Sequence, residues 1–524
     1  MHPDMQASST ESNEIQERVF TFLTHDDTTR IDTHGASVFL EGKRALKIKR
    51  AVKFPFLDYS TLDKRKAACE EEIRINSPLA PQIYHRVVAI TEERDGSLRI
   101  GGDGTPVEYA VEMSRFDESR TLDHLAKAGP LADEVAADIA DAIAASHAIA
   151  QRVEGAWVAL IPSLIDGNSG GLRTGGHLPA SEIDALTRSS HQAFARVRSM
   201  LEARSRQGFV RRCHGDLHLA NIVEIDQRPV LFDAIEFDPD IASTDVLYDL
   251  AFTLMDLLHY GQQQAASILF NQYLSTTPAE NLDGLGALPL FLSIRAAIRA
   301  QVTLAKVTLA KLKRPHADQA DIVAEARRYF ELAKALIDPP APRLIAVGGL
   351  SGTGKSLLAR MLAPAVGPAP GAVVLRSDIF RKRLFGVAET DRLPPSAYKP
   401  DVTDRVYEML AERARHVLAQ GYSALVDAVF AQESERDTMT AMARACNVPL
   451  KGFFLVADLA TRQTRIGRRR NDASDATAEV AAHQEHYNIG QVGWDTIDAA
   501  GTPEQTLDRC RAAMAGERSS DWRG

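Results

Sequence analysis

The feature that most constrains the fold of this chain is one glycine-rich stretch, residues 349–356. It fits the pattern G-x-x-x-x-G-K-[ST], and its members are Gly349, Leu350, Ser351, Gly352, Thr353, Gly354, Lys355 and Ser356. The apolar run 344–347 precedes it and a helical pattern, 357–362, follows it. Glycines let backbone N–H groups point inward at phosphates, and the helix N-terminus adds its positive end. The stretch therefore predicts a nucleotide-binding loop, with Lys355 on the β- and γ-phosphates and Ser356 on Mg²⁺.

Length and composition bound the class of protein. The 524 residues allow about two to four domains, and the 45% hydrophobic and 25% charged content is that of a soluble globular protein. A net charge of -9 argues against a nucleic-acid-binding surface spread over the whole protein. The four cysteines are far apart and form no metal-binding pattern, and no apolar run reaches 18 residues. We expect a cytoplasmic protein that binds neither nucleic acid nor membranes.

The residues after 343 alternate between strand and helix patterns. The predicted order is a strand, loop and helix over 344–364, then strands at 373–376, 424–429, 450–456 and 494–497, with helices between them. Such alternation is typical of a doubly wound parallel sheet, which holds ligands at the carboxyl ends of its strands. We predict an α/β domain over 343–515 and a short tail, 516–524. Three prolines mark residues 338–342 as a linker before it.

The first half has a different pattern, α+β. Short strands are predicted at 38–40, 44–49, 86–90, 98–100 and 107–113, with a charged helix at 61–76. From residue 121 the apolar period becomes helical, first over 121–152 and then to about 336, with a glycine-rich loop at about 166–177. We predict one domain over 15–337, preceded by a frayed polar tail, 1–14.

A second chemical motif lies within that helical region. The stretch 213–222 reads C-H-G-D-L-H-L-A-N-I and supplies Asp216 and Asn221, while the apolar strand 230–232 ends at Asp233. Phosphoryl transfer requires a carboxylate that orients a hydroxyl and accepts its proton, together with oxygen ligands for Mg²⁺. Asp216, Asn221 and Asp233 have the side chains and the spacing to supply both the proton-accepting carboxylate and the oxygen ligands for Mg²⁺.

The pattern H-G-D-x-x-x-x-N followed by a strand ending in Asp resembles the aminoglycoside phosphotransferase-like branch of the protein-kinase fold. That resemblance implies that Asp216 is the catalytic base, that Asn221 and Asp233 hold Mg²⁺, and that Asp249 braces the catalytic loop. It also implies a nucleotide-binding lysine paired with a helix glutamate, for which Lys47 and Glu72 are the best matches. Lys49 and Glu71 are the alternatives, since Lys47 and Lys49 face the same side of one strand.

Two further expectations come from this resemblance. Residues 112–115 would form the hinge beside the adenine. The glycine-rich loop that normally covers the phosphates has no counterpart before Lys47, where only Gly35 is able to shape such a turn.

Three more sites are predicted at the carboxyl ends of the second domain's strands. Asp378, in the run S-D-I-F-R, is a candidate catalytic base for an acceptor hydroxyl, with a helix N-cap as the alternative. Asp427 ends a buried strand and suits a Mg²⁺ ligand. Arg465 and Arg469 lie four apart on one helix face, so both are able to close over phosphates, although an arginine run is more often a solvated surface.

Together these features resemble small P-loop kinases related to shikimate, gluconate and zeta-toxin kinases. The whole chain resembles a bacterial two-domain family that joins a phosphotransferase-like half to such a kinase half. The resemblance implies ATP or another nucleoside triphosphate and Mg²⁺ as cofactors, and small-molecule hydroxyl acceptors as partners. It leaves three functions open: two active kinases, one kinase regulated by a nucleotide-binding partner domain, or a zeta-toxin-like kinase acting on a nucleotide sugar.

Overall fold

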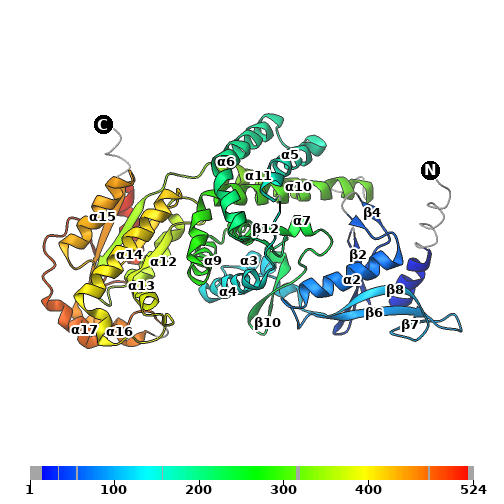
Figure 1. The fold of residues 1–524 in the computed structure, drawn as a ribbon, viewed down its shortest axis with the longest axis horizontal. Helices are drawn as coiled ribbons and strands as arrows, with labels where there is room; N and C mark the ends of the chain where they lie inside the picture. The colour runs from blue at the N-terminus through cyan, green and yellow to red at the C-terminus, as the bar shows by residue number, and fades with distance from the viewer. Residues whose placement is uncertain are drawn as a thin grey trace. The chain divides into compact units, whose positions relative to one another are not determined.

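The structure, a computed structural model, describes residues 14–33, 35–54, 57–155, 157–313, 319–469 and 472–516. Most of the two predicted tails, 1–13 and 517–524, lies outside these residues. The chain forms two compact units (Figure 1). The first contains the residues up to Leu164 together with Leu201–Gln262, and the second contains Ile165–Met200 and all residues from Gln263 onward.

The first unit begins with a six-stranded antiparallel sheet in the order β1-β2-β3-β8-β6-β7. Its strands are β1 (Thr29–Asp32), β2 (Ala36–Glu41), β3 (Arg44–Lys49), β6 (Tyr84–Glu92), β7 (Leu98–Ile100) and β8 (Thr105–Ser114). Helix α2 (Leu62–Asn76) begins at its N-cap Thr61, whose hydroxyl accepts the N–H of Lys64. One face of this helix packs on β6 and β8, where Cys69 joins the core beside Tyr84 and Val111 (Figure 1). The predicted strands and helix of this region are all present.

The predicted helix 121–152 is two helices, α3 (Leu122–Ala128) and α4 (Asp133–Ile149). Pro130 lies between them and cannot donate the N–H that a continuous helix requires. The loop predicted at 166–177 is wrong, because α5 (Trp157–Arg173) and a 3-10 turn (Thr174–Gly176) cover this stretch. The glycines there serve close packing: a Cβ on Gly171 would lie 2.2 Å from the side chain of Gln301.

The catalytic motif of the first unit lies between short strands. Strand β9 (Val210–Arg212) pairs with β12 (Ser243–Asp245), and β10 (Ile222–Ile225) pairs with β11 (Arg228–Leu231) as a hairpin. The motif connects β9 to β10, and helix α8 (Val246–His259) follows β12. Nearly every residue of α8 is buried, so this helix is a rigid base beneath the motif.

The second unit carries a five-stranded parallel sheet in the order β14-β15-β13-β16-β17. Its strands are β13 (Leu344–Gly349), β14 (Val373–Arg376), β15 (Ala424–Asp427), β16 (Leu450–Val456) and β17 (Asp495–Asp498). The connecting helices include α12 (Lys355–Leu362), α13 (Ser377–Leu384), α14 (Pro400–Ala419), α15 (Glu433–Ala445), α16 (Leu459–Arg468), α17 (Ala478–His483) and α18 (Pro503–Gly516). Strand β13 is central and fully buried, and it leads straight into the glycine-rich loop. The predicted doubly wound sheet is confirmed.

Long helices complete the second unit: α6 (Ala180–Arg206), α9 (Gln263–Thr276), α10 (Leu288–Lys313) and α11 (Ala320–Ile337). The stretch Ala279–Val307 is long and apolar enough to cross a membrane, but 67% of its most apolar window is buried against the rest of the protein, as in a core helix. Residues 338–342, the predicted linker, follow the end of α11 and contain no helix or strand.

The edge strand β14 is covered by α9. The side-chain amide of Asn271 behaves like a neighbouring strand: its oxygen accepts the N–H of Val374 at 2.7 Å, and its nitrogen donates to the carbonyl of Ala372 at 3.1 Å. The rings of Phe270 and Tyr422 pack beside it, 5.8 Å apart. These contacts close a sheet edge that would otherwise present unpaired backbone groups.

Candidate active sites

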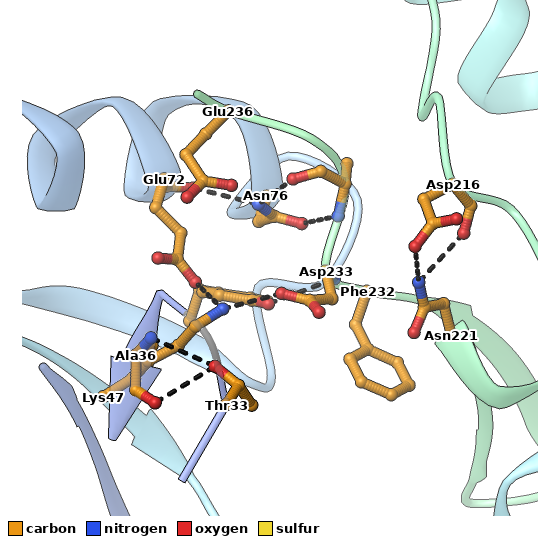
Figure 2. Close-up of polar contacts among 12 residues, drawn as sticks. Thr33, Ala36, Lys47, Glu72, Asn76, Asp216, Asn221, Phe232, Asp233 and Glu236 are labelled. Atoms are coloured by element: carbon orange, nitrogen blue, oxygen red, sulfur yellow. Dashed lines mark hydrogen bonds and ion pairs between the residues drawn. The ribbon is translucent and has the colours of Figure 1, made fainter. Parts of the chain in front are cut away.

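In the first unit, Lys47 lies between two carboxylates (Figure 2). Its Nζ donates to Glu72 Oε1 at 2.8 Å and to Asp233 Oδ1 at 2.7 Å. Lys47 comes from β3, Glu72 from the buried face of α2, and Asp233 from the segment that follows β11. Three elements that are far apart in sequence thus meet at one ammonium group.

The two alternative residues occupy different positions. Lys49, only 2% exposed, contacts the other oxygen of Glu72 at 2.5 Å and also pairs with Glu236. Glu71 pairs with Arg74 on the outer side of α2. Of the candidates, Lys47 and Glu72 are therefore the pair that the structure places beside Asp233.

Charge explains how this cluster is stabilised. Burial alone would lower the pKa of Lys47, but the carboxylates of Asp233 and Glu72 outweigh it and raise that pKa well above its usual value. The Lys47 ammonium lowers the pKa of Asp233 in turn. All three groups are charged at neutral pH, as a site for polyphosphate and Mg²⁺ requires.

The catalytic loop is held by the buried helix α8. Asp249 accepts the N–H of Gly215 at 2.8 Å, Asp256 accepts the N–H of Leu219 at 3.0 Å, and Thr253 donates to a loop carbonyl at 2.7 Å. These three helix residues lie on one face of α8. The backbone of Gly215 has a φ of 84°, a conformation that favours glycine. Asp249 thus has the bracing position that the resemblance implied.

The predicted base Asp216 is bonded to Asn221, whereas the carboxylate of Asp233 is directed at Lys47 (Figure 2). The amide nitrogen of Asn221 donates to the backbone carbonyl of Asp216 at 2.9 Å and to its carboxylate at 3.3 Å, which leaves the amide oxygen as the atom for a cation. Asp233 has a φ of 61°, a conformation that is uncommon for a non-glycine residue and that recurs at functional sites as well as in turns. His214 fixes that segment, since its Nε2 donates to the carbonyl of Phe232 at 2.9 Å.

The structure places the expected adenine hinge, residues 112–115, and the expected phosphate-covering turn at Gly35 at the ends of strands of the six-stranded sheet. Residues 112–115 lie at the end of β8, and the carboxylate of Glu112 pairs with Arg44 and Arg86 at 2.8 Å each. Gly35 lies in the short connection between β1 and β2, where its carbonyl accepts the N–H of Arg50 at 2.8 Å.

In the second unit, the glycine-rich loop has the conformation of a phosphate cradle. Gly349, Gly352 and Gly354 have φ values of 136°, 89° and 95°. A Cβ on Gly352 would lie 2.6 Å from the carbonyl oxygen of Arg462, so only glycine fits there. Lys355 begins α12 and donates to the carbonyl of Leu350 at 3.2 Å across the loop, and burial lowers its pKa.

The predicted acids of this unit face the loop. Asp427 ends the buried strand β15, and its carboxylate lies 3.5 Å from the guanidinium of Arg376. Asp378 is the second residue of α13, whose N-cap is Arg376, so the N-cap alternative for Asp378 is wrong. Burial, together with the charge of Asp427, raises the pKa of Asp378. A carboxyl group with a raised pKa is suited to accept a proton from a hydroxyl.

The two predicted lid arginines both line a cavity of about 300 Å³ beside the loop. The prediction that they share one helix face is wrong, because α16 ends at Arg468 and Arg469 is its C-cap, with an extended backbone. The guanidinium of Arg465 bonds the carbonyls of Thr353 and Gly501 at 3.4 and 2.7 Å. Within the described ranges, Arg469 Nη1 and Arg462 Nε are buried with no hydrogen-bond partner. Buried donors without partners beside a glycine cradle fit a bound polyphosphate. Arg468 is exposed, so the solvated-surface alternative holds for this residue of the run.

Sequence reasoning missed four residues of this site: Arg376, Arg462, Asp472 and Gln484. Arg376 bonds Asp472 at 3.1 Å, and Gln484 accepts a loop N–H. The run S-D-I-F-R also offers Arg381 as a cation for the charged groups of an acceptor, but its guanidinium is buried against the carbonyl of Ala397 at 2.6 Å and is not available for that role. A local motif shows neither that a residue supports the site nor that a residue is used elsewhere in the core, because both depend on partners about 15 to 130 residues away.

The family described as "AAA domain" matches residues 344–487. The uncharacterized protein Rv2004c of Mycobacterium tuberculosis is 30% identical over 502 residues, which cover 91% of this chain and 93% of the relative.

Two solved structures are also similar. A choline/ethanolamine kinase family protein from Mesorhizobium loti is 16% identical, with a TM-score of 0.40, and covers 62% of this chain and 95% of its own. A gluconokinase from Sinorhizobium meliloti is 20% identical, with a TM-score of 0.25, and covers 34% of this chain and 99% of its own. The mycobacterial relative matches along nearly its full length, and the two halves of this chain carry the fold and motifs described above. The chain therefore belongs to the bacterial family that joins an aminoglycoside phosphotransferase-like domain to a P-loop kinase domain.

Proposed function

We propose that the protein is a bifunctional ATP-dependent phosphotransferase, in which each half transfers a γ-phosphoryl group to a hydroxyl of a small molecule. The observation that carries this proposal is that each unit brings a lysine suited to phosphate near a carboxylate suited to Mg²⁺. In the first unit Lys47 donates to Asp233 at 2.7 Å, and in the second Lys355 begins the helix after the glycine-rich loop, near enough to Asp427 for the charge of that carboxylate to act on the lysine's pKa. When bound, Mg²⁺ neutralises charge on the phosphates and draws electrons from the transferring group.

In the first unit, Asn221 and Asp233 would hold the metal, and Lys47 would contact the nucleotide phosphates. Asp216 orients the acceptor hydroxyl and takes its proton as the new oxygen–phosphorus bond forms and the bond to the β-phosphate oxygen breaks. Because Asn221 bonds the carboxylate of Asp216 at 3.3 Å, the base and the metal site are held in register.

In the second unit, residues 349–356 would surround the phosphates, with Ser356 and Asp427 on the metal. Asp378 takes the proton of the acceptor hydroxyl. Arg469 would stabilise charge on the transferring group, since its Nη1 is one of the buried donors of this site that have no hydrogen-bond partner among the described residues. Arg465, which already bonds three carbonyls, would line the nucleotide cavity.

The proposal is tested with the full chain, Mg²⁺-ATP and a mixture of small metabolites, by mass spectrometry for products heavier by one phosphoryl group. Asp216→Asn should abolish one set of products, and Lys355→Ala should abolish a different set. If Lys355→Ala abolishes every product and Asp216→Asn abolishes none, one kinase regulated by the other domain is the better description. If the full chain transfers phosphate to no small molecule, the proposal is wrong.

A further inference from the structure

The two lysines of β3 share one glutamate. Side chains two residues apart on a strand lie on the same face, and Lys47 and Lys49 contact different oxygens of Glu72, at 2.8 and 2.5 Å. Glu72 is fully buried, and Lys49 is almost so. A buried carboxylate that is divided between two ammonium groups does not by itself favour either one.

A second carboxylate resolves this competition. Glu236, 8% exposed, forms an ion pair with Lys49 and accepts a hydrogen bond from the hydroxyl of Tyr59 at 3.3 Å. Lys49 therefore has a counterion of its own. Opposite charges alternate from Glu236 through Lys49, Glu72 and Lys47 to Asp233.

The two ends of this series belong to the same short segment, because Glu236 follows Asp233 by three residues. The charges thus form a closed ring that joins β3, α2 and the segment 233–236. Asn76, one helical turn after Glu72, strengthens the junction: its side chain accepts the N–H of Ala234 at 2.8 Å and donates to the carbonyl of the same residue at 3.2 Å (Figure 2).

We propose that Lys49 and Glu236 are positioning residues, which keep Glu72 and Asp233 in place around Lys47 and thereby organise the nucleotide site of the first unit. This proposal rests on the proposed function of that unit. If Glu236 loses its charge, Lys49 takes a larger share of Glu72. If Lys49 is removed, Glu72 and Glu236 face each other as buried carboxylates without the ammonium between them.

The ring makes a distinctive prediction about the double variant. Glu236→Gln and Lys49→Met should each weaken binding of Mg²⁺-ATP by about tenfold, the size usual for residues that orient a ligand-binding group. Combined, they remove one positive and one negative charge, so Lys47 keeps Glu72 to itself and affinity should return to within about threefold of the parent.

The measurement is calorimetric titration of Mg²⁺-ATP into the full chain, with Lys355→Ala as the parent so that binding to the P-loop is suppressed. A second measurement needs no nucleotide: acylation of Lys47 by an amine-reactive reagent, read by peptide mass spectrometry. Lys47 should react faster in Glu236→Gln, which removes a negative charge that raises its pKa, and more slowly in Lys49→Met, which removes a neighbouring positive charge. In the double variant it should react at about the parental rate. Arg204→Met is the control, because Arg204 forms an equally buried ion pair with Asp245, at 2.8 Å, that does not contact the ring. It should lower the melting temperature and change neither readout.

The possible outcomes distinguish a failure of the positioning role from a failure of the proposed nucleotide site. A double variant as weak as the worse single variant, or single variants that bind and react like the parent, would show that the ring is only part of the core and would overturn the positioning role. If the parent itself binds no Mg²⁺-ATP but Lys47 reactivity still shifts in opposite directions in the two single variants and returns in the double, the positioning role stands and the proposed nucleotide site is wrong.

Discussion

Gln484 accepts the backbone N–H of Ser351 at 2.8 Å, and both residues are buried. Ser351 belongs to the glycine-rich loop, while Gln484 follows α17, at the end of the segment that carries the lid arginines. Arg462 secures the same junction by donating to the carbonyl of Ala481 at 2.6 Å. The far end of the lid segment is therefore bonded directly to the loop that would hold the phosphates.

Gln484→Leu should raise the KM for ATP of the second unit by about tenfold, because the loop N–H loses its partner and the loop loses a support. An unpaired buried N–H costs about 1–3 kcal/mol, so a lower melting temperature should accompany the kinetic change. Steady-state kinetics on the full chain checks this. The matched control is Gln463→Leu, since the side-chain amide of Gln463 donates to the carbonyl of Ala478, within the same lid segment rather than on the loop. Equal KM values for the two variants would mean that the Gln484 contact does not support the loop.

Lys355→Ala should reduce phosphoryl transfer by the second unit by about 10²-fold or more and leave the melting temperature nearly unchanged. The lysine contacts charge that develops during transfer, whereas it contributes little to the core. Product formation and thermal unfolding of the full chain are compared with those of Arg360→Ala, on the exposed face of α12. Undiminished activity in Lys355→Ala would show that the glycine-rich loop takes no part in phosphoryl transfer.

Asp216→Asn and Asp233→Asn should differ in which step they impair. Asp216 acts on the acceptor, so its amide variant should bind Mg²⁺-ATP normally and turn over about 10²-fold or more slowly. Asp233→Asn should weaken Mg²⁺-nucleotide binding itself, because the metal loses a charged ligand. Calorimetry and single-turnover kinetics distinguish the two. If both variants bind and turn over like the native chain, the first unit is not a kinase of this type.

Asp378→Asn should abolish transfer by the second unit and at the same time stabilise the metal-free protein at neutral pH. Burial and the nearby carboxylate of Asp427 raise the pKa of Asp378 in the folded state, so its ionised form costs stability at pH values above that pKa. The cost disappears as the pH falls below the ordinary pKa of a carboxyl group. Thermal unfolding in the presence of a chelator should therefore show a higher melting temperature for the variant at pH 7, and a smaller difference in acid. A variant less stable than the native chain at pH 7 would contradict this assignment of charge.

Much of the architecture follows from local patterns. Strand β3 begins and ends at the residues predicted for it, and the order of strands and helices after residue 343 is as expected, because the apolar period differs between the two kinds of element. The stretch 166–177 misled the prediction. Its glycines are typical of a loop in isolation, but in the protein they allow helices to pack closely, as Gly171 does against Gln301.

The sites were predictable only in part. Motif spacing brought Lys47, Glu72, Asp216, Asn221 and Asp233 into consideration, and the structure gathers these residues in the first unit. Spacing alone left Lys49 equivalent to Lys47, since both point to the same side of one strand. The distinction depends on Glu236, 187 residues from Lys49, and no local pattern reports such a partner.

The amide of Asn271 on the edge of β14 has a practical consequence for anyone who divides this protein. A fragment that starts at the proline-rich residues 338–342 would retain every strand of the parallel sheet but lose α9 and with it the cover of that edge. The exposed N–H and C=O groups of β14 would then be free to pair with the same edge of another fragment, and self-association would compete with folding. A fragment that starts near Gln263 would keep the cover, so it is the better choice for expressing the P-loop half alone.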